Sequence, residues 1–64
     1  MNHYFYLGTK HGTCLTDDDC DDIHFETLEK AIRHHQSCLR ETYREVYKYV
    51  YKVYAPTLVT ELKP

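Results

Sequence analysis

The sequence predicts a small α+β domain in which one helix packs on a small antiparallel or mixed sheet. Apolar residues recur at three- and four-residue steps between positions 25 and 39, which is the period of a helix face. Aromatic and β-branched residues alternate nearer both ends of the chain, which is typical of strands. Because the chain has 64 residues, we expect a single small domain over residues 1–64.

A loose hairpin is expected before the helix. Residues His3–Leu7 are aromatic, and Gly8 follows them, so a first strand is predicted there. The stretch 8–12 contains two glycines and predicts a turn. Thr13–Thr16 then provides a short return strand.

The helix is predicted over about residues 26–40. Six residues share its apolar face: Phe25, Leu28, Ala31, Ile32, His35 and Leu39. Two acid–base pairs with favourable i,i+4 spacing support it: Glu26 with Lys30, and Glu29 with Arg33. Thr27 or Asp22 is expected to cap its N-terminus.

The stretch 43–54 holds five of the seven tyrosines and admits two interpretations. Alternation with period two predicts a last strand over about 45–54, which completes a ββαβ arrangement. In that strand one face would pack on the helix, namely Tyr47, Tyr49, Tyr51 and Val53. The other would face outward, namely Val46, Lys48, Val50, Lys52 and Tyr54.

The alternative is one long helix over 26–54 that forms a coiled-coil dimer. A heptad-like apolar stripe continues through this stretch, and no Gly or Pro lies between Thr13 and Ala55. In either case residues 57–62 are expected to form a short final strand or a docking tail.

The helix start Phe25–Ile32, which reads F-E-T-L-E-K-A-I, resembles small phage-encoded proteins with a hairpin, a helix and a strand. The host RNA polymerase inhibitor of T7-like phages is similar in length, in this helix start and in its helix-then-strand ending. The resemblance implies a chain that binds and modulates or inhibits a host protein in the host cytoplasm. That inhibitor family uses arginines in its last strand, where this chain has Lys48 and Lys52.

The uneven charge distribution points to a protein partner. The chain has 8 basic and 10 acidic residues, a formal charge of −2, which does not favour nucleic acid. We expect partner binding through an acidic loop and through the outer face of the predicted last strand. The residues concerned are Asp17, Asp18, Asp19, Asp21 and Asp22 in the loop, and Lys48, Lys52 and Tyr54 in the strand. An exposed strand edge would also permit a homodimer.

The strongest candidate cofactor is zinc, and otherwise no cofactor is expected. Cys38 lies one turn after His34, so both would project from one side of the helix, and Cys14 and Cys20 precede them. This set resembles a zinc finger with ligands in the order Cys-Cys-His-Cys. The alternative function is therefore a zinc-stabilised mini-domain, with nucleic acid as its candidate ligand.

Other classes of function have less support. No catalytic motif is present, so we expect a non-enzymatic protein. Asp17, Asp19 and Asp21 match the first ligands of an EF-hand loop, but Asp22 and Leu28 stand where such a loop needs Gly and Glu. The chain has no signal peptide and no long apolar run, so we expect a cytoplasmic protein with reduced thiols and no membrane span.

Overall fold

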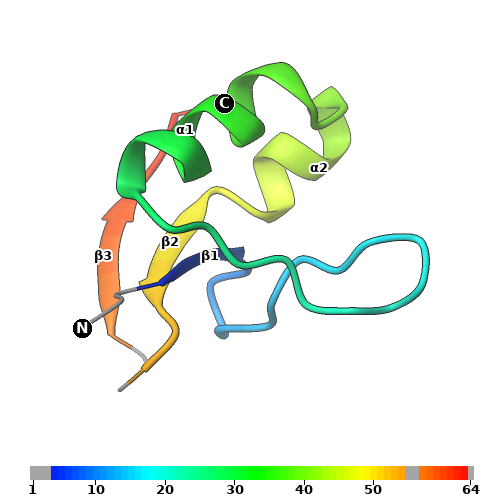
Figure 1. Cartoon of the computed structure of the whole chain (residues 1–64). Coiled ribbons are helices and arrows are strands. Elements are labelled where there is room, and N and C mark those ends of the chain that lie inside the picture. The colour runs from blue at the N-terminus through cyan, green and yellow to red at the C-terminus, as the bar shows by residue number, and fades with distance from the viewer. Residues whose placement is uncertain (1–3, 55–56, 64) are drawn as a thin grey trace.

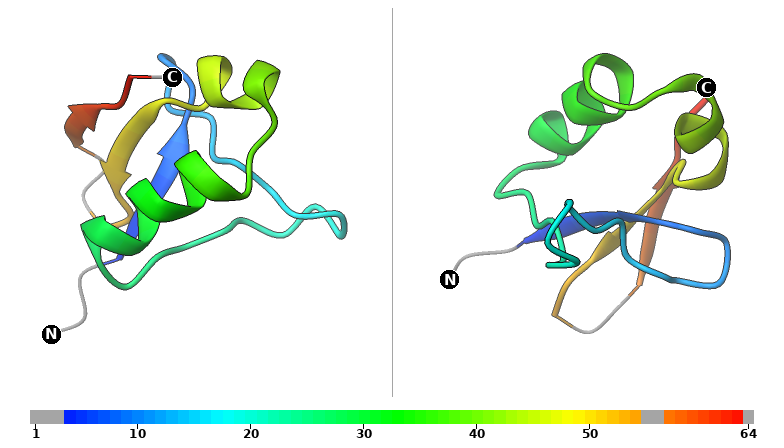
Figure 2. Two further views of the ribbon diagram at one scale, coloured as in Figure 1. Left: turned by 90° about the horizontal axis from the view of Figure 1, so that it is seen from above. Right: turned by 90° about the vertical axis from the view of Figure 1, so that its right-hand side faces the viewer.

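The computed structural model describes residues 4–54 and 57–63. Its elements, in chain order, are β1 (Phe5–Gly8), α1 (Leu28–Ser37), α2 (Glu41–Val46), β2 (Tyr49–Lys52) and β3 (Leu58–Glu61) (Figure 1). The strands form one antiparallel sheet in the order β1-β2-β3. Both helices lie on one side of this sheet (Figures 1 and 2). The predicted α+β class, with one main helix on an antiparallel sheet, is confirmed.

Helix α1 begins as its sequence predicts. The side chain of Thr27 accepts a hydrogen bond from the Lys30 amide at 3.1 Å, which satisfies one of the N–H groups left over at a helix start. Both predicted i,i+4 ion pairs are present and exposed. The helix ends at Ser37, before the predicted limit of 40. No helix within the described residues is long and apolar enough to cross a membrane.

The stretch 43–54 contains both a helix and a strand. The predicted strand over 45–54 is wrong in its first part, where α2 continues to Val46, and correct for β2. The alternative single helix over 26–54 is wrong because the chain leaves the helix at Cys38 and turns before α2. Tyr43 and Tyr47 contact each other in an i,i+4 pair, with ring centroids 6.3 Å apart. This i,i+4 contact favours a helix here, although the period-two alternation of the sequence favours a strand. The short final strand expected in 57–62 is confirmed as β3.

The predicted inner and outer faces of β2 are exchanged. Val50 pairs with Leu7 of β1, and both side chains are 0% exposed beneath α1, beside Ala31. Tyr51 lies on the opposite face and stacks on Tyr6 with ring centroids 5.1 Å apart. The physical reason is that a tyrosine hydroxyl needs a polar partner when its ring is covered. The Tyr51 hydroxyl finds one at the Thr9 carbonyl, 2.6 Å away, on the face away from the helix.

The predicted return strand at 13–16 is present only as isolated bridges. Gly8 pairs with Cys14, and Thr16 pairs with Asp22, beyond the outer side of β1. Gly8 allows the close approach, because a Cβ there would lie 2.9 Å from the Thr13 carbonyl oxygen. His3, where the first strand was expected to begin, lies outside the described residues.

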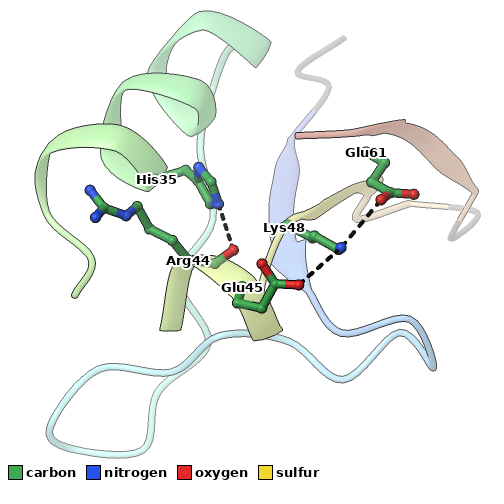
Figure 3. Close-up of polar contacts among 5 residues, drawn as sticks. All are labelled: His35, Arg44, Glu45, Lys48 and Glu61. Atoms are coloured by element: carbon green, nitrogen blue, oxygen red, sulfur yellow. Dashed lines mark hydrogen bonds and ion pairs between the residues drawn. The ribbon is translucent and has the colours of Figure 1, made fainter. Parts of the chain in front are cut away.

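Helix α2 depends on α1 because its own residues bury little. It is six residues long, has no side-chain cap and contains no buried residue. His35 of α1 is 1% exposed, and its Nε2 lies 2.9 Å from the Arg44 carbonyl oxygen, which is one of the terminal carbonyls of α2 (Figure 3). In return, the Arg44 guanidinium donates to the Gln36 carbonyl near the end of α1 at 3.4 Å. The two helices therefore cap each other.

The exchanged faces of β2 lead to a stability prediction. Val50→Ala is expected to lower the free energy of unfolding by about 2 kcal/mol, because it removes buried methyl groups and leaves a cavity. The same change at Val59, which is 37% exposed in β3, is expected to stay within about 0.5 kcal/mol. Urea unfolding of both variants measures the difference. Equal effects would contradict the position of Val50 in the core.

A second prediction concerns the helix–helix contact. His35→Ala is expected to cost about 2–4 kcal/mol, because the Arg44 carbonyl loses its donor and a buried ring is removed. His34→Ala, with the same change in helix propensity, is expected to cost about 1 kcal/mol or less. Thermal unfolding and amide exchange of α2 provide the measurement. Unchanged amide protection in α2 after His35→Ala would show that another contact holds that helix.

Candidate functional site

β3 is an edge strand of the sheet. β3 is last in the strand order, so its outer edge faces no other strand among the described residues. The Leu62 amide donates to the Lys48 carbonyl at 2.6 Å, toward β2. Because successive peptide groups of a strand point to alternate edges, the neighbouring Glu61 amide points outward. Leu58 and Val59 are both exposed along this strand.

Lys48, one of the predicted partner-binding residues, instead holds elements of the fold together. Its ammonium group lies 3.3 Å from a carboxylate oxygen of Glu45 in α2 and 3.4 Å from one of Glu61 in β3 (Figure 3). The hydrogen bond with Glu45 and that with Glu61 raise the pKa of Lys48. Its side chain is only 20% exposed. Its charge is therefore largely satisfied within the chain.

The other two predicted residues of that strand region remain on the surface. Lys52 is exposed at the end of β2, opposite Phe5 in the register. Tyr54 is exposed, and its ring meets that of Tyr4 edge-on with centroids 6.2 Å apart. The three predicted residues therefore do not form one exposed strip, because only Lys52 and Tyr54 are exposed.

The acidic loop projects from the body of the molecule (Figures 1 and 2). All five predicted residues are exposed: Asp17, Asp18, Asp19, Asp21 and Asp22. The Asp17 side chain accepts hydrogen bonds from the amides of Asp19 at 2.9 Å and Asp21 at 3.0 Å. This local turn shapes the loop. The carboxylates remain available to a basic partner.

The structure does not bring the four predicted zinc residues together. Cys20 and Cys38 are exposed, whereas Cys14 is half-buried. Within the part of the chain that the structure describes, two groups place three metal-binding side chains within 4.8 Å of one another: Cys14 with Asp22 and His24, and Asp17 with Asp19 and Asp21. Neither group contains Cys20, His34 or Cys38. His34 and Cys38 instead line a cavity of about 590 Å³ beside the acidic loop.

Sequence reasoning missed the grouping of Cys14, Asp22 and His24. A signal for it was present, because each of these residues stands next to an apolar residue in a period-two pattern. The pattern alone does not show that the segment of Cys14 pairs with the segment of Asp22 and His24, because the acidic loop separates them.

The environment of His34 leads to a pH prediction. Burial lowers the pKa of His34 below its ordinary value of 6.5, and its ring packs on Phe25 with centroids 5.1 Å apart. The neutral ring therefore favours folding. As the pH falls below 6.5, the unfolded chain takes up this proton first, so stability is lost until the pH has passed the lower pKa of the folded state.

His34→Gln is expected to remove this component of the pH dependence. Urea unfolding at a series of pH values, from neutral to well below the ordinary histidine pKa, measures it. The wild-type chain is expected to lose more stability over this range than the variant. Parallel stability curves for the two proteins would contradict the half-buried environment of His34.

Comparison with known proteins supplies no relative from which a function could be transferred. No protein-family model, no curated protein and no solved structure matches the chain. The resemblance of Phe25–Ile32 to phage inhibitors stays a prediction from the sequence, and function is inferred from the surfaces described above.

Proposed function

We propose that this chain is a small non-enzymatic interaction protein that binds an extended segment of a protein partner along the outer edge of β3. The observation that carries the proposal is the position of β3 at the end of the sheet, with its outer backbone groups facing no other strand among the described residues. An extended segment can hydrogen-bond to such an edge as an additional strand.

The side chains of β3 favour this mode of binding. Leu58 and Val59 are 52% and 37% exposed, and the pairing of β3 with β2 skips Val59, because Tyr51 pairs with Leu58 and Val50 pairs with Thr60. An added strand would cover these exposed apolar side chains. Proteins commonly protect open edges with lysine, proline or a β-bulge. Between Leu58 and Glu61, β3 has the register irregularity at Val59 but neither lysine nor proline.

The acidic loop supplies a second element of recognition. Its five exposed aspartates lie on a projecting segment, and their charge attracts a basic surface and raises the rate of encounter with it. The proposed partner therefore combines an extended apolar segment with basic residues.

The resemblance of Phe25–Ile32 to phage inhibitors supports a more specific form of the proposal. In that form the chain is phage-encoded and inhibits a host protein in the host cytoplasm, and bacterial RNA polymerase is the first candidate target. A second copy of the chain is the competing occupant of the β3 edge, because edge strands also pair with themselves.

The test compares lysine substitutions at two exposed valines. Val59→Lys places a charge on the β3 edge, whereas Val46→Lys places it on α2, where the valine is 45% exposed. The probes are peptides selected from a displayed random library on the immobilised wild-type chain, and purified bacterial RNA polymerase. Surface plasmon resonance measures the affinities. Val59→Lys is expected to weaken binding by about tenfold or more, and Val46→Lys to leave it unchanged.

Three outcomes would overturn the proposal. Failure of both probes to bind would remove the evidence for a protein partner. Loss of binding with Val46→Lys alone would move the site to α2. A wild-type dimer that Val59→Lys converts to a monomer in sedimentation analysis would make a second copy the occupant of the edge.

A further inference from the structure

We propose that Cys14, Asp22 and His24 form a binding site for one divalent transition-metal ion of the zinc class. The Cys14 sulfur, an Asp22 carboxylate oxygen and a His24 ring nitrogen all lie within 4.8 Å of one another. This set shares only Cys14 with the four residues that the sequence pattern predicted. It is independent of the β3 edge.

Backbone hydrogen bonds beyond β1 build the site. The Leu15 amide donates to the Leu7 carbonyl at 2.8 Å, and the Ile23 amide donates to the Leu15 carbonyl at 3.0 Å. Phe25 and Phe5 exchange two backbone hydrogen bonds at 2.7 and 2.8 Å. The segments around residues 14–16 and 22–25 are thus tied to each other and to β1.

Alternation along these segments then places the ligands together. Leu15 is buried in the core, and Ile23 and Phe25 pack against it. Adjacent residues of an extended segment point to opposite faces, so Cys14 and the pair Asp22 and His24 are directed away from the core. The packing that buries the three apolar side chains therefore brings the three polar ones together.

The donor set suits zinc. Thiolate, imidazole and carboxylate are the three protein ligand types that zinc uses, and sites with three protein ligands leave a position for water. Ligand atoms around tetrahedral zinc lie roughly 3.5 Å apart, so closure from the observed limit of 4.8 Å requires a shift of about an ångström. Asp22 and His24 are exposed and can rotate to make it.

The surroundings leave room for the remaining coordination position. A cavity of about 500 Å³ adjoins the three residues, and its walls include Tyr6, Thr16 and the aliphatic Val53. The volume accommodates a metal-bound water or a small ligand. The site is therefore open on the side away from the core.

The thiol of Cys14 is protonated at neutral pH when no ion is bound. Burial and the negative charge of Asp22 raise the pKa of the Cys14 thiol to about 11. Burial raises the pKa of Tyr6, and Asp22 contributes to this shift. Binding of a divalent ion therefore requires the Cys14 thiol to release its proton, and the charge of the ion then attracts both the thiolate and the Asp22 carboxylate.

The test uses a Cys20→Ser/Cys38→Ser background, in which Cys14 is the only thiol. Both replaced cysteines are exposed, so the fold is expected to persist, and circular dichroism checks this. Cobalt(II) is the probe because a thiolate ligand gives it an intense ultraviolet charge-transfer band. We expect one equivalent to bind with that band, and zinc to displace it. Zinc is also expected to raise the melting temperature, because it binds the folded state.

Single variants in this background identify the other ligands. His24→Ala and Asp22→Asn are each expected to weaken cobalt affinity by at least the roughly 10–100-fold that the loss of a ligand's hydrogen-bond partner costs. His34→Ala is the matched control and is expected to leave affinity unchanged. Absence of the charge-transfer band, or unchanged affinity in His24→Ala, would overturn the proposal. Loss of affinity in His34→Ala alone would also overturn it, because His34 would then be a ligand in place of Asp22 and His24.

Discussion

The burial of Leu7 against Val50 across β1 and β2 determines most of the structure. Both side chains are completely buried, in one core cluster with Leu15 and with Ala31 of α1, in a chain too short to bury many others. Because a shift of one residue would turn every side chain of a strand to the other face, this pair fixes the register of the sheet. The same register places Tyr6 and Tyr51 together on the far face.

The sequence was most informative where structure depends on neighbouring residues. Thr27 and the two ion pairs of α1 act within one or two turns, so the helix could be located from its pattern. The faces of β2 and the existence of α2 depend on distant contacts. Val50 lies inside because Leu7 lies opposite, and α2 forms where His35 caps its last turn. No local pattern within 43–54 contains that information.

The candidate sites show the same difference between features set by neighbouring residues and features set by distant contacts. The acidic loop was predicted from a run of adjacent aspartates, and it is exposed as expected. Lys48 was predicted to face a partner, but Glu45 and Glu61 surround it because α2 and β3 meet at the start of β2. The spacing of His34 and Cys38 along one helix suggested zinc ligands, yet their cysteine partners lie elsewhere. Helical spacing establishes a shared face, but it cannot show what approaches that face.

The two edges of the sheet differ, and this difference relates the proposed binding edge at β3 to the proposed metal site beside β1. The outer side of β1 is occupied by the bridges of Phe5 with Phe25 and Gly8 with Cys14, whereas β3 meets no further strand among the described residues. A metal held by Cys14, Asp22 and His24 would fasten the segments that close the β1 edge. Strand addition would then be directed to β3. A small chain with little core gains most from such a cross-link at the edge where its pairing consists only of isolated bridges.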